Sequence, residues 1–95
     1  MNTKSSYATC VVLVLLRNLG KSTRSIHQLS TYADKQMEKL HIKNTLSEST
    51  KYLVIKELIS TGILLSKNNE GMLSITLSPD VISYFKGEGD YEAVD

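Results

Sequence analysis

The stretch ESTKYLVIKELISTGILLSKNNEGMLSITLS, residues 48–78, decides the fold. Its first half predicts a helix, because Tyr52, Ile55, Leu58 and Ile59 gather on one face at helical spacing. Gly62 follows as the expected stop, since glycine readily takes the left-handed conformation in which many helices end. An amphipathic helix closed by a glycine is therefore the first element that this stretch predicts.

The second half of the stretch predicts a β-hairpin. Residues 63–66 (ILLS) and 72–78 (MLSITLS) have the composition of strands, and in the second run Leu73, Ile75 and Leu77 alternate with serine and threonine. This alternation predicts one buried face. Residues 67–71 (KNNEG) supply side chains that tolerate positive φ, so we expect them to form the hairpin loop.

Hydroxyl side chains mark the expected starts of the helices. Thr45 and Glu48 form the T-x-x-E pattern of a capping box for the helix described above, and Ser47 is an alternative cap two residues later. Ser25 is the expected cap of the preceding helix, and residues 20–25 (GKSTRS) before it predict a turn or a short extended piece. That preceding helix is amphipathic, with apolar residues recurring at helical spacing at Ile26, Leu29, Ala33, Met37 and Leu40.

The first helix is expected to begin near Ser5 or Ser6 and to end at Leu19–Gly20. It contains a largely apolar run of nine residues, Ala8 to Leu16, and is apolar nearly all round, which predicts burial on several sides. In so short a chain this favours burial against a second copy, so we expect a homodimer through this helix. The run is too short to span a membrane, and no signal-peptide cleavage pattern follows it.

The C-terminal part predicts one more short helix and a tail. Ser78 can cap this helix, Pro79 suits its first position, and Gly87 follows it. We expect one domain over residues 1–87 and an acidic flexible tail over residues 88–95. The basic residues all lie within residues 1–86, which carry a formal charge of +5, whereas the four acids after them give −4. A basic body with an acidic tail is compatible with nucleic-acid binding but is also common in proteins that bind none.

Several classes of site find no support in the sequence. The one cysteine, Cys10, cannot form an internal disulfide and lies in an apolar helix, which indicates a reducing cytoplasm and an inert buried thiol. His27 and His41 are 14 residues apart, roughly 21 Å along a continuous helix, so they cannot share a metal ion. No paired carboxylates or nucleophile constellation stands out. We therefore expect no enzyme activity, no cofactor and no metal site.

The order of elements, helix, helix, helix and then a two-stranded hairpin, resembles that of the winged helix-turn-helix superfamily. The resemblance is most specific where Ser49, Thr50, Leu58, Gly62 and Ile63 match the third helix of small MarR-like bacterial regulators. It implies a mainly α fold with a β-hairpin (α+β): three helices, a two-stranded wing and a short C-terminal helix. It also implies a DNA-binding protein of transcriptional control.

The same resemblance implies which residues would contact duplex DNA. A helix that enters the major groove reads bases through its exposed side chains, while the wing and neighbouring segments contact the backbone. On this reading three groups form the interface. The third helix contributes Ser47, Ser49, Thr50 and Lys56, the wing tip contributes Lys67, Asn68 and Asn69, and the segment before the second helix contributes Lys21, Thr23 and Arg24.

Other features favour a different use of the same fold. The charges of the third helix, Glu48, Lys51, Lys56 and Glu57, cancel, Lys51 falls toward the side expected to pack, and Leu53 lies on the polar face. The chain also resembles, more weakly, the winged-helix accessory subunits of SMC-type and ABC-ATPase systems, through Gly20–Lys21, Ser25 and Leu58–Ile63. That resemblance implies a non-catalytic subunit of a larger complex, in which Tyr52 and Leu53 contact the partner.

Overall fold

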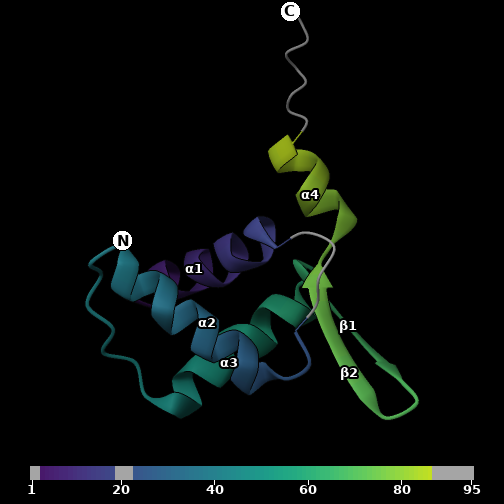
Figure 1. The fold of residues 1–95 in the computed structure, drawn as a ribbon, viewed down its shortest axis with the longest axis horizontal. Helices are drawn as coiled ribbons and strands as arrows, with labels where there is room; N and C mark the ends of the chain where they lie inside the picture. Colours follow the sequence, from purple (N-terminus) through teal and green to yellow (C-terminus); the bar gives the residue numbers. More distant parts are fainter. Residues whose placement is uncertain (1–2, 19–22, 87–95) are drawn as a thin grey trace, which may run out of the picture.

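The computed structural model describes residues 3–18 and 23–86 of the chain. Its elements are α1 (Thr3–Arg17), α2 (Ile26–Lys39), α3 (Glu48–Ser60), β1 (Leu64–Asn69), β2 (Met72–Leu77) and α4 (Pro79–Lys86). Figure 1 shows α1, α2 and α3 together in one body, with the hairpin along one side and α4 extending away from it. The expected class, mainly helical with one antiparallel hairpin, is confirmed.

The core is built around α1. Its residues Tyr7, Cys10, Val11, Val14 and Leu15 are all buried, and the helix contacts α2, α3 and β2. The expectation that α1 is buried on several sides is therefore confirmed. The other elements contribute the apolar faces predicted from their periodicity, with the buried residues Leu29, Ala33, Met37, Val54, Ile55, Leu64, Ile75 and Leu77.

The segment between α1 and α2 is tied to the hairpin by a single β-bridge. The backbone N–H of Thr23 donates to the carbonyl of Ile75 (3.3 Å), and the N–H of Ile75 donates to the carbonyl of Thr23 (3.0 Å). Residue 23 is thus the extended piece predicted within residues 20–25. The bridge fixes the hairpin relative to the body at a point where both backbones are buried.

The helix starts agree with the sequence for α2 and α4 and differ for α1 and α3. Ser25 caps α2, because its Oγ accepts the N–H of Gln28 (3.0 Å). α1 begins at Thr3 and not at Ser5 or Ser6, and this earlier start lets Thr9 Oγ1 donate to the Ser5 carbonyl within the helix (2.9 Å). The expected end at residues 19–20 lies outside the described residues.

The capping box predicted for α3 is wrong, and the alternative cap is confirmed. Ser47 is the N-cap, and its Oγ accepts the N–H of Thr50 at 3.2 Å. Glu48 is therefore the first helical residue and cannot reach back as the third residue of a capping box does. Its carboxylate instead lies 3.4 Å from the ammonium group of Lys51. At the other end Gly62, with φ +87°, follows the helix as predicted.

The hairpin turn is tighter than the five-residue loop predicted from residues 67–71. β1 continues through Asn69, which pairs with Met72, so that Glu70 and Gly71 alone form the turn. Both have positive φ, 53° and 83°, as a two-residue turn matching the twist of the strands requires. The prediction failed because it treated polar residues as loop, whereas Lys67 and Asn68 sit on exposed positions of a strand.

The remaining expectations concern α2 and α4. The apolar stripe of α2 is buried at Leu29, Ala33 and Met37, but Leu40 lies beyond the last helical residue and is exposed. α4 begins as predicted, since Pro79 is its first residue and Ser78 Oγ accepts the N–H of Asp80 (3.2 Å). Gly87 and the tail lie outside the described residues.

Tyr7 provides a test of how α1 and α2 are held together. Its hydroxyl is fully buried and donates to Ser30 Oγ (2.8 Å), and burial raises the pKa of Tyr7 from 10.0 to about 12. Tyr7→Phe should lower the free energy of unfolding by about 1 kcal/mol at pH 7, because Ser30 loses its partner. A folded-state pKa above the unfolded value adds stability that is complete below pH 10 and is lost as the pH rises toward 12.

Urea unfolding of the wild type and Tyr7→Phe from pH 7 to pH 12 measures both effects. The variant should lose less stability than the wild type above pH 10, so the difference between the two proteins should shrink or reverse there. Lysines also titrate in this pH range, but they do so in both proteins and cancel in the difference between them. A difference in stability that stays constant from pH 7 to pH 12 would contradict the prediction.

Candidate interaction surface

Lys51 is the one lysine of α3 that points inward, as its place on the packing side predicted. Its ammonium group lies 3.1 Å from Asp34 Oδ1 of α2 and 3.4 Å from Glu48 Oε2, and its side chain is only 10% exposed. Burial lowers the pKa of Lys51, but the hydrogen bond and charge of Asp34, helped by Glu48, outweigh it, so the pKa lies above its ordinary value. Lys51 is therefore charged and already neutralised within the protein.

Asp34 also holds the connection between α2 and α3. The side-chain amide of Asn44 donates to Asp34 Oδ1 at 2.8 Å. One carboxylate of α2 thus contacts both the connecting segment and the buried lysine of α3. The ion pair therefore lies on the side of α3 that faces α2, the side on which Val54 and Ile55 are also buried.

The outward face of α3 carries Ser49, Leu53, Lys56, Glu57 and Ser60, all of them exposed. These positions follow helical spacing, so they lie on one side of the helix, opposite the buried Val54 and Ile55. Leu53 is 64% exposed at the middle of this face. Its neighbour Tyr52, the other residue expected to contact a partner, is half-buried.

Three of the residues expected to contact DNA lie together at the start of α3. Ser47 Oγ is 3.2 Å from Ser49 Oγ and 2.9 Å from Thr50 Oγ1, and it also accepts the N–H of Thr50. These hydroxyls therefore already bond to one another and to the helix end. Lys56 is exposed two turns further along the same helix.

The hairpin residues expected to contact DNA are spread along β1. Lys67 and Asn68 are exposed and pair with Ser74 and Leu73 across the hairpin, while Asn69 pairs with Met72 beside the turn. In Figure 1 the hairpin tip and the start of α3 both lie at the lower end of the molecule but well apart from each other. The structure therefore places these two groups at separate points of the surface.

Of the residues before α2 that were expected to contact DNA, one is buried and another is exposed. Thr23 is only 5% exposed, because its backbone pairs with β2, whereas Arg24 is exposed and its N–H donates to Gln28 Oε1 at 2.8 Å. Lys21 lies outside the described residues. Arg24 is thus the one member of this group whose side chain the structure places at the surface.

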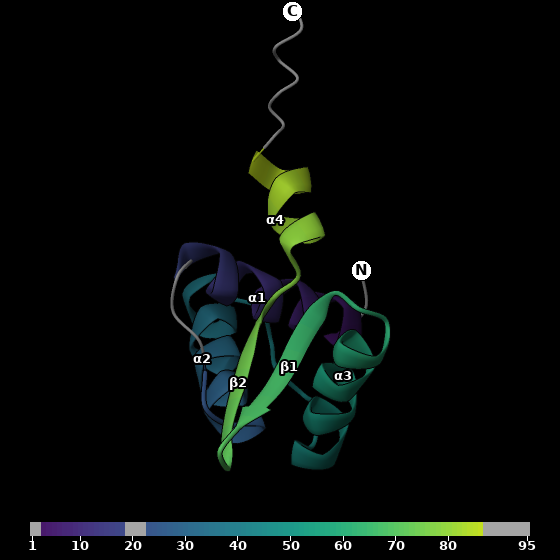
Figure 2. The same ribbon diagram turned by 90° about the vertical axis from the view of Figure 1, so that its right-hand side faces the viewer.

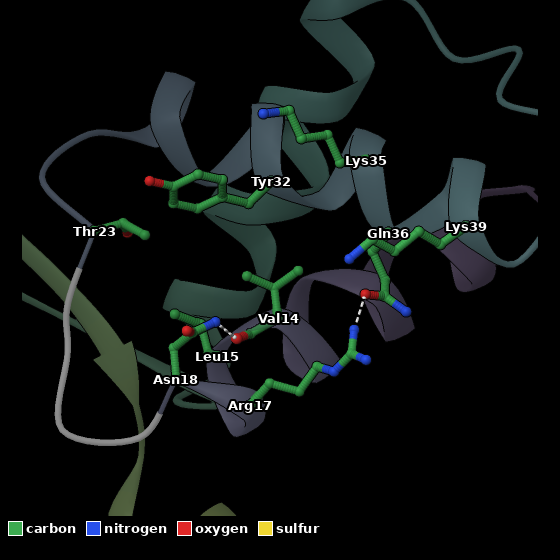
Figure 3. A pocket seen from close by; sticks show the side chains of 9 residues that line it. All are labelled: Val14, Leu15, Arg17, Asn18, Thr23, Tyr32, Lys35, Gln36 and Lys39. Carbon is green, nitrogen blue, oxygen red and sulfur yellow. Dashed lines mark hydrogen bonds between the residues drawn. The ribbon is translucent and has the colours of Figure 1, made fainter.

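A polar groove that was not predicted from the sequence lies between α1 and α2 (Figure 3). Its volume is about 400 Å³, and its lining includes Tyr32, Lys35, Gln36 and Lys39 of α2 with Arg17 of α1. The spacing i, i+3, i+4, i+7 on α2 places those four residues on one helical face and was a usable signal. The part that α1 contributes depends on how the two helices cross, which the sequence pattern does not contain.

An apolar groove lies between α1 and α4. Its volume is about 470 Å³, and it is lined mainly by Ala8, Val12, Leu58, Ile63, Val81, Tyr84 and Phe85. Tyr84 is 79% and Phe85 54% exposed, and their rings meet edge to face with centroids 5.4 Å apart. Large aromatic side chains this exposed are unusual on a surface that stays in water.

The described residues contain no group of three or more His, Cys, Asp or Glu side chains arranged to hold a metal ion. His27 and His41 are both exposed, and Cys10 is buried, which raises the pKa of its thiol. In the same part of the chain no helix combines the length and apolar character needed to cross a bilayer.

Comparison with known proteins adds no relative. No protein-family model matches the sequence, and neither the curated proteins nor the solved structures contain a match. The fold and surfaces of the chain itself are therefore the basis for inferring its function.

Proposed function

We propose that the chain is a winged-helix module that docks on a larger protein partner through the outward face of α3. The order of three helices followed by a hairpin supports the winged-helix arrangement. The antiparallel bridge between Thr23 and Ile75 also supports it, because it pairs the residue before α2 with strand β2. α3 packs inward through Val54 and Ile55 and leaves its opposite side free. A helix held in this way is suited to present a surface to another molecule.

The main support for docking on a protein is that Leu53 is exposed on a face of α3 without net positive charge. A single exposed leucine is common on protein surfaces, so the charges around it decide. Because Lys51 is held by Asp34, the exposed charges of α3 are Glu48, Lys56 and Glu57, a formal sum of −1. An apolar centre with a mixed polar rim is the ordinary composition of a protein interface.

A helix with these charges is poorly suited to a DNA groove. Affinity for duplex DNA depends largely on neutralised phosphates, and α3 offers Lys56 alone against two carboxylates. The weaker resemblance to winged-helix accessory subunits supports an SMC-type or ABC-ATPase assembly as the class of partner. The chain would then serve as a non-catalytic structural subunit of that assembly.

Duplex DNA is the second candidate. The hydroxyls of Ser47, Ser49 and Thr50 at the N-terminus of α3 favour it, because a helix N-terminus attracts phosphate. Exposed Lys67 and Asn68 on the hairpin could add backbone contacts. On this proposal the chain would act in transcriptional control.

Two measurements on the wild-type chain test the first proposal. Gel filtration of a native lysate treated with nuclease should place the chain well above the size of its own monomer or dimer. Chemical cross-linking of that fraction should join Lys56, one turn from Leu53, to a different protein more often than Lys67, which is exposed on the hairpin. Elution at the size of the free chain, together with salt-sensitive binding to a labelled duplex, would refute docking on protein and favour DNA.

We also propose that the chain forms a homodimer through α1 and the apolar groove. In Figure 1 and Figure 2, α4 extends away from the body. Its residues Tyr84 and Phe85 line the apolar groove together with Ala8 and Val12 of α1 and are largely exposed. In a dimer with a two-fold axis, each copy would cover the apolar groove of the other. The expected contact includes Ala8 and Val12, which are only partly buried in the single chain.

Phe85→Glu is expected to convert this dimer into a monomer at micromolar concentration. A carboxylate placed in an apolar interface would be desolvated without a partner, and both copies would carry it. Light scattering coupled to gel filtration measures the mass directly. Met72→Glu is the matched control, since Met72 is equally exposed but lies at the hairpin turn. A wild-type chain that is monomeric, or a Phe85→Glu variant that stays dimeric, would contradict the proposal.

A further inference from the structure

The polar groove between α1 and α2 has cationic walls without acidic partners. Arg17 comes from α1, and Lys35 and Lys39 come from α2. No acidic residue lines the groove, and the ion pairs found among residues 3–18 and 23–86 all involve Lys51. Among the described residues, none of these three cations is therefore held in an ion pair.

One end of the groove holds a buried hydroxyl that lacks a partner. Thr23 Oγ1 is inaccessible to solvent and makes no hydrogen bond within the described structure. In Figure 3 the hydroxyl of Tyr32 points toward this same end, and Asn18 lies below it. A buried hydroxyl without an acceptor destabilises the folded chain, whereas the hydroxyl of Tyr32, whose residue is 41% exposed, is accessible from the groove.

The rest of the groove combines cationic and apolar surface. Arg17 donates a hydrogen bond to Gln36 Oε1, and Figure 3 shows Lys39 reaching toward that pair from α2. Val14, Leu15 and the ring of Tyr32 supply the apolar wall. A volume of about 400 Å³ lies within the usual range for small-molecule sites.

We propose that the polar groove binds a small organic anion, a carboxylate or phosphate monoester on an apolar or aromatic body. The cations attract the anionic group, the exposed hydroxyl of Tyr32 can donate to the ligand, and the apolar wall covers its body. The site is separate from the outward face of α3, so it does not depend on whether α3 contacts a protein or DNA.

An NMR titration of the ¹⁵N-labelled chain tests the proposal with three probes of similar size: benzoate, phenyl phosphate and the neutral benzamide. Benzoate or phenyl phosphate should cause saturable shifts of the amides of Asn18, Thr23 and Gln36 at millimolar concentration, whereas benzamide should bind at least roughly tenfold more weakly. Equal binding of benzamide, or no saturable shift with either anion, would overturn the proposal.

Charge-reversal variants show whether the groove cations are responsible. Lys35→Glu combined with Lys39→Glu should weaken anion binding by roughly tenfold or more. Lys43→Glu combined with Lys67→Glu is the matched control, because both lysines are exposed and neither lines the groove. If this control weakens binding as much as the groove variant, the effect reflects net charge and the proposed site is wrong.

Tyr32→Phe tests the accessible hydroxyl independently of charge. Tyr32 is 41% exposed and its hydroxyl oxygen accepts the side-chain amide of Gln28 at 3.3 Å, so its own proton is available to a ligand. The variant should weaken anion binding several-fold while the Tm changes little. Unchanged anion affinity would show that the Tyr32 hydroxyl does not contact the ligand.

Discussion

Leu53→Lys should release the chain from its protein partner while leaving its fold unchanged. Leu53 is 64% exposed on the outward face of α3, and lysine is as good a helix former as leucine, so the Tm should stay within a few degrees. At the centre of an interface the new ammonium group would be desolvated without a carboxylate to receive it. We expect the affinity for the partner to fall by roughly 100-fold or more, about 3 kcal/mol.

The same substitution separates the two proposed functions, because it acts on them in opposite directions. If α3 faces duplex DNA, Leu53→Lys adds a cation near the phosphates, so binding should become tighter and its salt dependence steeper. Anisotropy with a labelled duplex and gel filtration of the lysate measure the two outcomes. Leu40→Lys is the control, since Leu40 is also exposed but lies at the end of α2. Tighter DNA binding without loss of a complex would reject docking on protein.

The periodicity of the sequence was sufficient to predict the class of the fold. Alternation in residues 72–78 predicted the buried positions Ile75 and Leu77, and helical spacing predicted Leu29, Ala33 and Met37. The errors occurred where local patterns compete. The cap of α3 is Ser47 and not Thr45. The polar residues of β1 were predicted as a loop because exposed strand positions and loops have similar compositions.

The functional surfaces were less predictable than the fold because they depend on packing between elements. Helical spacing predicted that Lys51 turns inward and Leu53 outward, yet nothing in the sequence identified Asp34, 17 residues earlier, as the partner of Lys51. The burial of Thr23 likewise follows from its pairing with Ile75, which is remote in sequence. Contacts of this kind emerge only once the helices and the hairpin have definite positions.

Asp34→Asn should lower the free energy of unfolding by about 2 kcal/mol. It leaves Lys51 largely buried with only Glu48 nearby, while asparagine keeps an oxygen for the amide of Asn44. The cost falls below the 3–5 kcal/mol typical of a fully buried pair because Asp34 is 36% exposed and water partly replaces it. Urea unfolding at neutral pH measures the change.

Lys51→Met separates the charge of the pair from the packing of α3. Methionine fills a similar volume without a charge, and the freed Asp34 can be hydrated, so this variant should lose less than about 1 kcal/mol. In the Lys51→Met background Asp34→Asn should then cost almost nothing, which gives a coupling of about 2 kcal/mol in a double-mutant cycle. Additive losses would show that the two residues act separately. Because the outward face of α3 is unchanged in Lys51→Met, this variant should keep the partner affinity that Leu53→Lys loses.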